Sequence, residues 1–361
     1  MRRIIQNAQQ FTPAIANEVL AGRYSAPITS VDVQPLGEGV GLLSSIGRAT
    51  LGFGSLDLDK EKSTTVIIKV VSQNENIEIA KGLNFYLNEV NFYRDLASGC
   101  PIKSPECLYA EIDPETQEFL LILEDFGTEV AGDQLEGCKP EVLTLAFEGA
   151  AKMHAHYWEK VGDIPWLSYH DDEDLTLFRR DTIYKPSIQP TLDEFGEFFH
   201  GNLERTVARI GEQFAEISTA AMSGPQTLTH GDYRIDNMLL PTRGDKLEIV
   251  AVDWQNTRGG NCTHDIAYFS SQSCGPELRG KTELASLRHY HDVLIDNGVK
   301  NYTFDECLTH YRLNLMLTMI TPIAVCGTLD SGNERGTELG KVMLSRSLAA
   351  LETMECDQLL K

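Results

Sequence analysis

One short segment carries the residues that could do chemistry. It reads His-Gly-Asp-Tyr-Arg-Ile-Asp-Asn, residues 230–237, and its Asp232 and Asn237 are five positions apart. Sixteen residues after Asn237, an apolar segment ends at Asp253, which is followed by Trp254. Two carboxylates and one amide are the side chains needed to accept a proton from a hydroxyl group and to hold a cation bound to phosphate. The spacing therefore points to phosphoryl transfer.

The chemistry explains why these three residues come from two segments. A transferred phosphoryl group has a loose transition state, so the protein mainly positions the attacking hydroxyl and neutralises charge through Mg²⁺. Asp232 would accept the proton, and Asn237 would reach the metal from the same short loop. Asp253 would approach the metal from the end of a strand that we expect over residues 247–252, because that segment is mostly apolar and β-branched. The alternative is that the His-Gly-Asp segment is an ordinary turn and that Asp253 merely ends a strand.

The two segments together resemble those of kinases. The loop is similar to the H-R-D-x-x-x-x-N loop of protein kinases, with Gly231 in place of the arginine, and Asp253 is followed by Trp-Gln instead of Phe-Gly. His-Gly-Asp with Asp-Trp-Gln resembles the aminoglycoside phosphotransferase superfamily, near its choline kinase-like and ecdysteroid kinase-like branches. The resemblance implies that Asp232 is the catalytic base and that Asn237 and Asp253 bind Mg²⁺.

The resemblance extends loosely over residues 36–311 and implies a protein-kinase-like, two-lobe fold of the α+β class. A small N-terminal lobe, residues 1–127, would hold an antiparallel sheet with one key helix and bind the nucleotide. A mainly helical lobe, residues 128–361, would carry the catalytic loop and bind the substrate. The loop departs from the ecdysteroid branch at Arg234, where a tryptophan is usual.

A glycine-rich segment supplies a candidate phosphate-binding loop. Gly37, Gly39 and Gly41 lie close together before a predicted strand, and glycines allow backbone amides to lie against phosphate oxygens. The resemblance implies that these glycines bind the nucleotide. By itself the pattern also fits an ordinary hairpin or loop.

Lys69 lies inside a predicted strand, residues 65–71, that is apolar on both faces. Burying an ammonium group is costly unless an anionic partner accompanies it. We expect a helix over residues 82–97, where Glu89 lies among apolar neighbours. A Lys69–Glu89 ion pair would satisfy both residues, and the resemblance implies that it holds Lys69 against the α- and β-phosphates. Alternatively, Lys69 extends to solvent and Glu89 is a helix surface residue.

Residues 119–124 are predicted to form a buried strand that leads into a turn between the lobes. The resemblance implies that the backbone of Glu124, Asp125 and Phe126 contacts the adenine ring. Asp125-Phe126-Gly127 also spells the metal motif of protein kinases, but it precedes the catalytic loop. This position argues against a metal role for Asp125.

Asp265 resembles the second aspartate of the superfamily, which braces the catalytic loop by hydrogen bonds. Thr263 or Asp265 could also cap the helix that follows. Only eleven residues separate Asp253 from Asp265, and no Ala-Pro-Glu anchor follows them. A protein kinase needs a longer activation segment and that anchor, so a peptide substrate is rejected.

A competing motif occupies residues 275–282, Gly-Pro-Glu-Leu-Arg-Gly-Lys-Thr, which match the P-loop pattern. A P-loop should follow a buried strand, but residues 268–274 are polar and serine-rich, and Glu277 would place a carboxylate near phosphates. We interpret the segment as a surface turn before a helix at residues 283–294. A P-loop nucleoside triphosphatase is the less favoured alternative.

Composition limits the class of protein. The chain has 361 residues, a formal net charge of −22 and eight cysteines without a C-x-x-C pair. The negative charge opposes binding to nucleic acid or to an anionic membrane. The cysteine pattern indicates neither a zinc site nor a disulfide framework, and no apolar run reaches the ~18 residues of a membrane span. These features predict a cytoplasmic enzyme with no nucleic-acid, membrane or evident protein partner.

We therefore expect an ATP-dependent kinase that uses Mg²⁺ to transfer the γ-phosphoryl group to a hydroxyl of a small molecule. The sequence does not separate ATP from GTP. An amino alcohol, an aminoglycoside, a steroid-like alcohol and a hydroxyacyl thioester all remain open as acceptors. The main alternative is a catalytically inactive kinase-fold module that binds nucleotide. His154 and His156 fall on a predicted amphipathic helix, residues 141–160, and are interpreted as structural or surface residues.

Overall fold

The computed structural model describes residues 3–36, 44–54, 63–72, 77–127, 130–328 and 334–361. The chain divides into two compact units. Unit 1 comprises Met1–Glu129 together with Val252–Asn256, and unit 2 comprises Val130–Ala251 together with Thr257–Lys361. The segment that carries Asp253 therefore groups with the N-terminal part of the chain, although it follows the catalytic loop in sequence.

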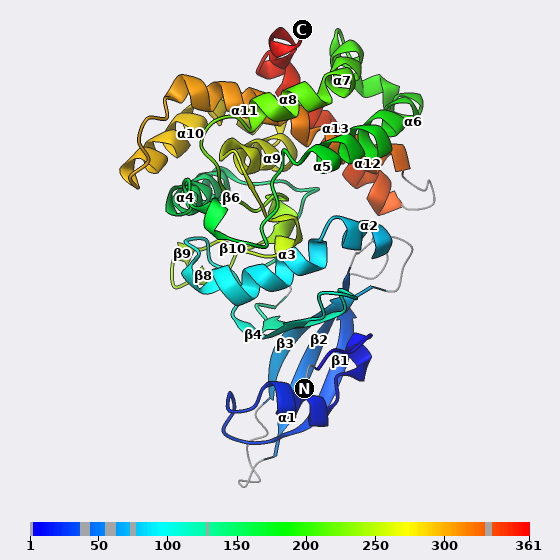
Figure 1. Cartoon of the computed structure of the whole chain (residues 1–361), viewed down its shortest axis with the longest axis vertical. Coiled ribbons are helices and arrows are strands. Elements are labelled where there is room, and N and C mark those ends of the chain that lie inside the picture. The colour runs from blue at the N-terminus through cyan, green and yellow to red at the C-terminus, as the bar shows by residue number, and fades with distance from the viewer. Residues whose placement is uncertain (1–2, 37–43, 55–62, 73–76, 128–129, 329–333) are drawn as a thin grey trace. The chain divides into compact units, whose positions relative to one another are not determined.

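Unit 1 is built on a five-stranded antiparallel sheet with the strand order β1-β2-β3-β5-β4 (Figure 1). The strands are β1 (Ile28–Leu36), β2 (Ser44–Phe53), β3 (Ser63–Val71), β4 (Cys107–Ile112) and β5 (Phe119–Glu124). The central strand β3 pairs with β2 and β5, so Lys69 lies opposite Ile46 on one side and Leu121 on the other. The expected strands at residues 65–71 and 119–124 are both confirmed.

Both faces of this sheet are covered, which explains why β3 is apolar on both faces from Val66 to Val71, apart from Lys69. Val66 and Ile68 are fully buried on the face that packs against the short helix α1 (Pro13–Val19). On the other face, Tyr86 of helix α3 (Phe85–Asn91) lies 5.3 Å from Phe119 of β5, measured between ring centroids. Because successive side chains of a strand alternate between faces, Lys69 points to the face that α3 covers.

The helix expected over residues 82–97 begins later than predicted. Helix α2 (Ile77–Gly82) ends where that helix should begin, and Asn84, with φ of 58°, has a left-handed backbone that separates α2 from α3. After α3, a π-helical turn (Phe92–Leu96) and a short 3₁₀ turn (Ala97–Gly99) continue the helical path. Asparagine tolerates the left-handed region better than most residues, so the break falls at Asn84.

Unit 2 is mainly helical (Figure 1). Its helices are α4 (Pro140–His156), α5 (Glu173–Phe178), α6 (Lys185–Phe195), α7 (Leu203–Glu212), α8 (Phe214–Ala221), α9 (Thr263–Ser273), α10 (Pro276–Asp296), α11 (Phe304–Thr318), α12 (Ile320–Thr328) and α13 (Glu334–Thr353). A π-helical turn, Arg179–Tyr184, joins α5 to α6. Every residue of α9 is buried, although the helix contains three serines and a glutamine. It packs against α4, α11 and α13, so polar side chains lie in the centre of this unit.

Short strands frame the catalytic segment of unit 2. Strand β6 (Thr227–Thr229) pairs with β11 (Arg258–Gly260), and β7 (Met238–Leu239) pairs with β10 (Val250–Ala251). The loop from His230 to Asn237 lies between β6 and β7, and its last three residues form a 3₁₀ turn. Both ends of the loop are thus held by antiparallel pairs.

The continuous strand predicted over residues 247–252 is wrong. Strand β9 (Lys246–Leu247) pairs with β8 (Thr242–Arg243) around Gly244, whereas β10 pairs with β7. The two pieces therefore have different partners, and Glu248 and Ile249 between them belong to neither ladder. The apolar pattern indicated burial correctly but could not reveal this change of partner.

Residues 275–282 are neither a P-loop nor a surface turn. They enter α10, which begins at Pro276 and runs without interruption to Asp296. Proline is favoured at the first position of a helix, and Glu277 and Lys281 form an exposed ion pair of 2.6 Å one turn apart. A continuous helix leaves no loop whose amides could surround a phosphate, so the P-loop alternative is wrong.

None of the helices in the described segments combines the length and hydropathy needed to cross a bilayer.

Candidate active site

The catalytic loop of unit 2 is fixed by one buried carboxylate. Asp265 of α9 is fully buried, and its two oxygens accept hydrogen bonds from the backbone amides of His230 (2.8 Å) and Gly231 (2.9 Å). The bracing role that the resemblance implied for Asp265 therefore matches its contacts. Helix capping does not, because the side chain that accepts from the first turn of α9 is that of Asn261, whose Oδ1 accepts from the amide of Thr263 at 3.0 Å. Gly231 has φ of 80°, a backbone conformation that favours glycine at this position.

His154 supports Asp265, a contact that the sequence did not predict. Its Nε2 lies 3.1 Å from a carboxylate oxygen of Asp265, and its Nδ1 lies 2.7 Å from the hydroxyl of Tyr290. Burial raises the pKa of Asp265, but the hydrogen bond from His154 and the nearby histidine charges outweigh burial and lower it. Asp265 therefore stays an ionised acceptor at neutral pH. The expectation that His154 is a structural residue is confirmed, and His156 is exposed.

Asp232 and Asn237 are brought together within the loop. The amide nitrogen of Asn237 donates to the Asp232 carboxylate and to the Asp232 carbonyl, both at 2.9 Å. Arg234 Nε donates to the other carboxylate oxygen of Asp232 at 3.1 Å, and the hydroxyl of Tyr268 also hydrogen-bonds Asp232. Burial raises the pKa of Asp232, but the Arg234 charge and the hydrogen bonds from Tyr268 and Asn237 lower it below its usual range. Asp232 is thus a partly buried, oriented carboxylate.

The donor atoms of this loop fit a hard cation. Because Asn237 uses its nitrogen toward Asp232, its Oδ1 faces elsewhere, and this oxygen has no hydrogen-bond partner among the described residues. Side-chain amide and carboxylate oxygens are the ligands that Mg²⁺ takes in proteins, together with water and phosphate oxygens. The chemistry of Asn237 and Asp253 therefore suits Mg²⁺ better than a softer metal.

In unit 1, one buried ammonium joins three segments. Lys69 Nζ lies 2.6 Å from Glu89 of α3 and 3.0 Å from Asp253. Lys69 and Glu89 are almost fully buried, while the side chain of Asp253 is 28% exposed. The Lys69–Glu89 ion pair predicted from the sequence is confirmed as a contact, and the contact with Asp253 is an addition that the sequence did not predict.

The charges of this cluster depend on one another. Burial by itself lowers the pKa of Lys69, but the two carboxylates outweigh burial and raise it, so Lys69 remains charged. Burial and the nearby Asp253 raise the pKa of Glu89 above its usual range, although Lys69 opposes this. One ammonium faces two carboxylates, and Glu89 Oε2 has no partner among the described residues. The cluster therefore has an excess of negative charge near Asp253.

Aromatic stacking anchors the Asp253 segment to α3. The rings of Trp254 and Phe92 are stacked, with centroids 3.7 Å apart and planes inclined by 8°. Asn88 also donates its side-chain amide to the carbonyl of Gln255 at 3.1 Å. Asp253 itself has φ of 64°, a left-handed conformation that is uncommon outside glycine. Strain of this kind persists only where the surroundings enforce it, as these anchors do.

Glu124 and Asp125, which were predicted to contact the adenine ring, also have structural contacts within unit 1. Asp125 accepts two hydrogen bonds from Arg48 of β2, at 2.6 and 3.0 Å, so its carboxylate is engaged in an ion pair. The backbone amide of Glu124 already donates to the carbonyl of Glu106 at 2.9 Å. Phe126 is half-buried after the end of β5. Gly37, Gly39 and Gly41 lie outside the described residues.

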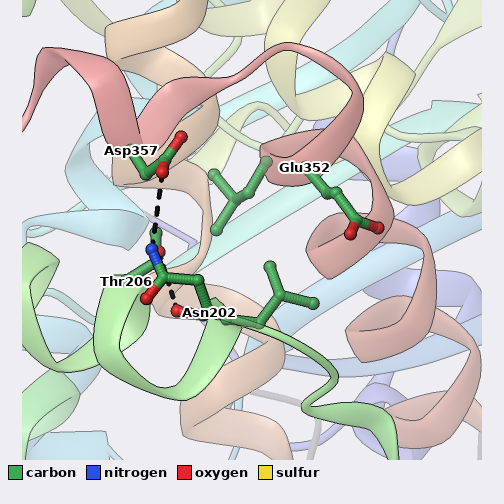
Figure 2. Close-up of a pocket in the computed structure, with 6 residues that line it drawn as sticks. Asn202, Thr206, Glu352 and Asp357 are labelled. Carbon is green, nitrogen blue, oxygen red and sulfur yellow. Dashed lines mark hydrogen bonds between the residues drawn. The ribbon is translucent and has the colours of Figure 1, made fainter.

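A pocket in unit 2 is lined by none of the candidate residues. Figure 2 shows Asn202 and Thr206 at the start of α7 near Glu352 of α13 and Asp357. The Asn202 amide donates to Asp357 at 3.4 Å, and the Thr206 hydroxyl donates to the Asn202 carbonyl at 3.0 Å. No residue of the catalytic loop lines this pocket, so we assign no acceptor to it.

Comparison with known families identifies the family of this chain. The model of the ecdysteroid kinase-like family matches residues 38–302, well over half of the chain. The chain belongs to the ecdysteroid kinase-like family. The predicted superfamily resemblance is thus confirmed. A comparison with curated proteins finds no significant match.

Solved structures establish the fold. A structure from Ralstonia eutropha assigned to the aminoglycoside phosphotransferases is 11% identical, with a TM-score of 0.50, and the match covers 97% of this chain and 98% of that one. Wild-type aminoglycoside 2′-phosphotransferase-IIIa with GDP is 12% identical, with a TM-score of 0.53 and coverage of 90% and 93%. APH(2″)-IIIa with GDP and kanamycin is 11% identical, with a TM-score of 0.56 and coverage of 93% and 98%.

The predicted α+β, protein-kinase-like fold is therefore confirmed. At such low identity these likenesses speak for the fold alone. Together with the family match, the fold indicates a kinase-like small-molecule phosphotransferase.

The brace at Asp265 generates a prediction that needs no substrate. In Asp265→Asn, one of the two buried backbone amides that donate to Asp265 should lose its acceptor. An unsatisfied buried donor costs about 1–3 kcal/mol, so the free energy of unfolding should fall by that amount in denaturant titrations. The matched control is Asp245→Asn, in the exposed turn between β8 and β9, which should change stability little. Equal stability of the two variants would contradict the bracing role.

Proposed function

We propose that this chain transfers the γ-phosphoryl group of ATP to a hydroxyl group of a small molecule in the cytoplasm. In this proposal Asp232 is the catalytic base, and Asn237 and Asp253 hold Mg²⁺. The observation that carries the proposal is the state of Asp232: it is an ionised carboxylate, oriented by Asn237, in a loop whose preceding amides are fixed by Asp265. The eight free thiols fit a reducing compartment.

Asp232 would act on the acceptor hydroxyl. A carboxylate that is ionised at neutral pH can accept the hydroxyl proton as the oxygen attacks the γ-phosphorus and the bond to the ADP oxygen breaks. Asn237 holds one carboxylate oxygen of Asp232 and Arg234 the other. These two contacts restrict the rotation of Asp232, which keeps the base in one orientation toward the acceptor.

The nucleotide would be held by unit 1. Lys69, supported by Glu89, would contact the α- and β-phosphates, and Gly37, Gly39 and Gly41 would offer backbone amides to the phosphates. The backbone around Glu124, Asp125 and Phe126 would contact the adenine ring. Since the amide of Glu124 is already bonded to Glu106, we assign the adenine contacts mainly to the two residues that follow it.

Bound Mg²⁺ would neutralise the charge that develops on the transferred phosphoryl group. The excess negative charge around Asp253 supports this role, because a cation near that carboxylate would balance the second acid of the Lys69 cluster. Asn237 Oδ1, which has no partner among the described residues, would be the other protein ligand.

The base is tested with Asp232→Asn, which keeps the shape of the side chain and removes its basicity. Hydroxylated metabolites are screened with the purified wild-type protein for acceptor-dependent release of ADP. With an acceptor found in this way, kcat of Asp232→Asn should fall by about 10²–10⁴-fold, because a positioned general base contributes that much. Nucleotide affinity should stay close to that of the wild type and of Asp245→Asn. A nucleotide-binding wild type that transfers phosphoryl to no acceptor would instead support the inactive module.

The metal ligand is tested with Asp253→Asn by measuring ATP affinity with and without Mg²⁺. Wild-type affinity should rise with Mg²⁺, and in Asp253→Asn that rise should shrink by about tenfold or more, since even indirect disturbance of a metal site costs about 10–100-fold in metal affinity. Glu89→Gln is the matched control, because it disturbs the same Lys69 cluster without touching a proposed ligand. It should weaken ATP binding and preserve its response to Mg²⁺. An unchanged Mg²⁺ response in Asp253→Asn would exclude Asp253 as a ligand.

A further inference from the structure

Four basic side chains gather behind the catalytic loop of unit 2, and we call them the basic cluster: His170, Arg179, Arg258 and His264. Arg258 lies opposite Thr229, the residue that precedes the catalytic loop, in the pairing of β11 with β6. The backbone amide of His170 donates to the carbonyl of the next residue of β11 at 3.0 Å. Arg179 begins the π-helical turn after α5, and His264 belongs to α9. Segments far apart in sequence thus bring these side chains to one place.

The members of the basic cluster contact one another. The rings of His170 and His264 lie 4.2 Å apart, measured between centroids, and are inclined by 33°. An Arg179 guanidinium nitrogen lies 3.5 Å from Nδ1 of His170, whose Nε2 hydrogen-bonds the hydroxyl of Thr229 at 2.9 Å. The side chain of Arg258 is buried and donates to Ser168.

Arg179 of the basic cluster is weakly neutralised by the described residues. Among the described residues, no carboxylate oxygen lies within 4.0 Å of the Arg179 guanidinium. Asp172 acts on both arginines from a greater distance, but it is exposed, and its carboxylate accepts from the amide of Leu175 to cap α5. Burial, and then the charge of Arg258, lower the pKa of Arg179 to about 9. Burial likewise lowers the pKa of Arg258 to about 10.

The histidines add no further charge at neutral pH. Burial lowers the pKa of His170 well below its usual value, and the charges of Arg179 and Arg258 add to the shift. Burial also lowers the pKa of His264, although Asp265 opposes the change. Both rings are therefore neutral, and the charge of the basic cluster is that of two guanidinium groups. A partly buried Arg179 guanidinium whose counter-charge, Asp172, is exposed and distant is costly to the free protein.

Tyr268 connects the basic cluster to the catalytic carboxylate. Its hydroxyl hydrogen-bonds Asp232 and lies 2.9 Å from the hydroxyl oxygen of Thr321. The same tyrosine interacts electrostatically with Arg179, and its ring centroid lies 6.2 Å from that of His264. The side of Asp232 that Tyr268 contacts therefore leads to the basic cluster. Arg179 is only partly buried, so a ligand can reach its guanidinium.

We propose that the basic cluster binds an anionic group of the acceptor, a carboxylate or a phosphate, with Arg179 as the contacting residue. This inference rests on the proposed function, in which the acceptor hydroxyl lies at Asp232. A guanidinium fork binds both oxyanions through paired hydrogen bonds, and an anion would supply the counter-charge that Arg179 lacks within 4.0 Å among the described residues. An acceptor with amino groups would instead meet two like charges. The chain should thus prefer hydroxylated acids or hydroxylated phosphate esters to amino alcohols.

The anion site is tested first without catalysis, by titrating inorganic phosphate into the protein in a calorimeter. Wild type, Arg179→Met and Arg180→Met are compared. Arg180 is the matched control because it is the next residue and is paired with Asp181 at 2.6 Å. Arg179→Met should lose about ten- to a hundredfold in phosphate affinity, the expected effect of removing a charged pair of hydrogen bonds, and Arg180→Met should lose little. Any phosphate bound at the nucleotide site is common to all three proteins. Equal affinities would overturn the proposal.

Acceptors matched in size then separate the carboxylate from the phosphate. Glycerate, glycerol 3-phosphate, glycerol and 3-amino-1,2-propanediol are compared for ADP release, together with the acceptors found by screening. We expect turnover with anionic acceptors, with KM about ten- to a hundredfold higher in Arg179→Met and kcat less affected, and partial rescue in Arg179→Lys. Equal use of cationic acceptors, or an unchanged KM in Arg179→Met, would overturn the inference. Phosphate binding that depends on Arg179 without turnover of any acceptor would instead refute the proposed function.

Discussion

The buried ammonium of Lys69 is the constraint on which the nucleotide-binding half of the structure depends. A charge taken out of water costs several kcal/mol unless partners surround it, and the partners of Lys69 come from elsewhere in the chain. Glu89 is carried by α3, and Asp253 by a segment that follows the catalytic loop. The stack of Trp254 on Phe92 holds that segment in place. When Glu89 is ionised, one ammonium faces two carboxylates, and a further cation near Asp253 would balance the second negative charge.

Features that follow from the cost of burying charge could be predicted from the sequence. A lysine in a strand apolar on both faces requires a carboxylate, and Glu89 was the acid among apolar residues at helical spacing. Two further features followed from the resemblance of the His-Gly-Asp and Asp-Trp-Gln segments. They are the α+β, kinase-like fold and the hydrogen bonds that Asp265 accepts from the catalytic loop. These motifs are informative because their chemistry requires each residue type at its position.

Features that depend on which distant segments meet could not be predicted. The residues around Ile249 are apolar enough for a strand, yet β9 and β10 pair with different partners. The left-handed conformation of Asn84 divides what periodicity indicated as one helix. His154 looked like one of many helix residues, and only the folded chain places it against Asp265. Arg179 carries no sequence signal at all, because a basic cluster assembled from four segments leaves no local pattern.

The central claim is that Asn237 and Asp253 share one cation beside the nucleotide. The most direct test is a crystal structure with a non-hydrolysable ATP analogue and Mn²⁺, which replaces Mg²⁺ and is located by its anomalous scattering. We predict a manganese peak with oxygens of Asn237, Asp253 and the β- and γ-phosphates as ligands, at distances of about 2.1 Å. A peak ligated by phosphates and other residues, with Asn237 or Asp253 outside its coordination shell, would contradict the account.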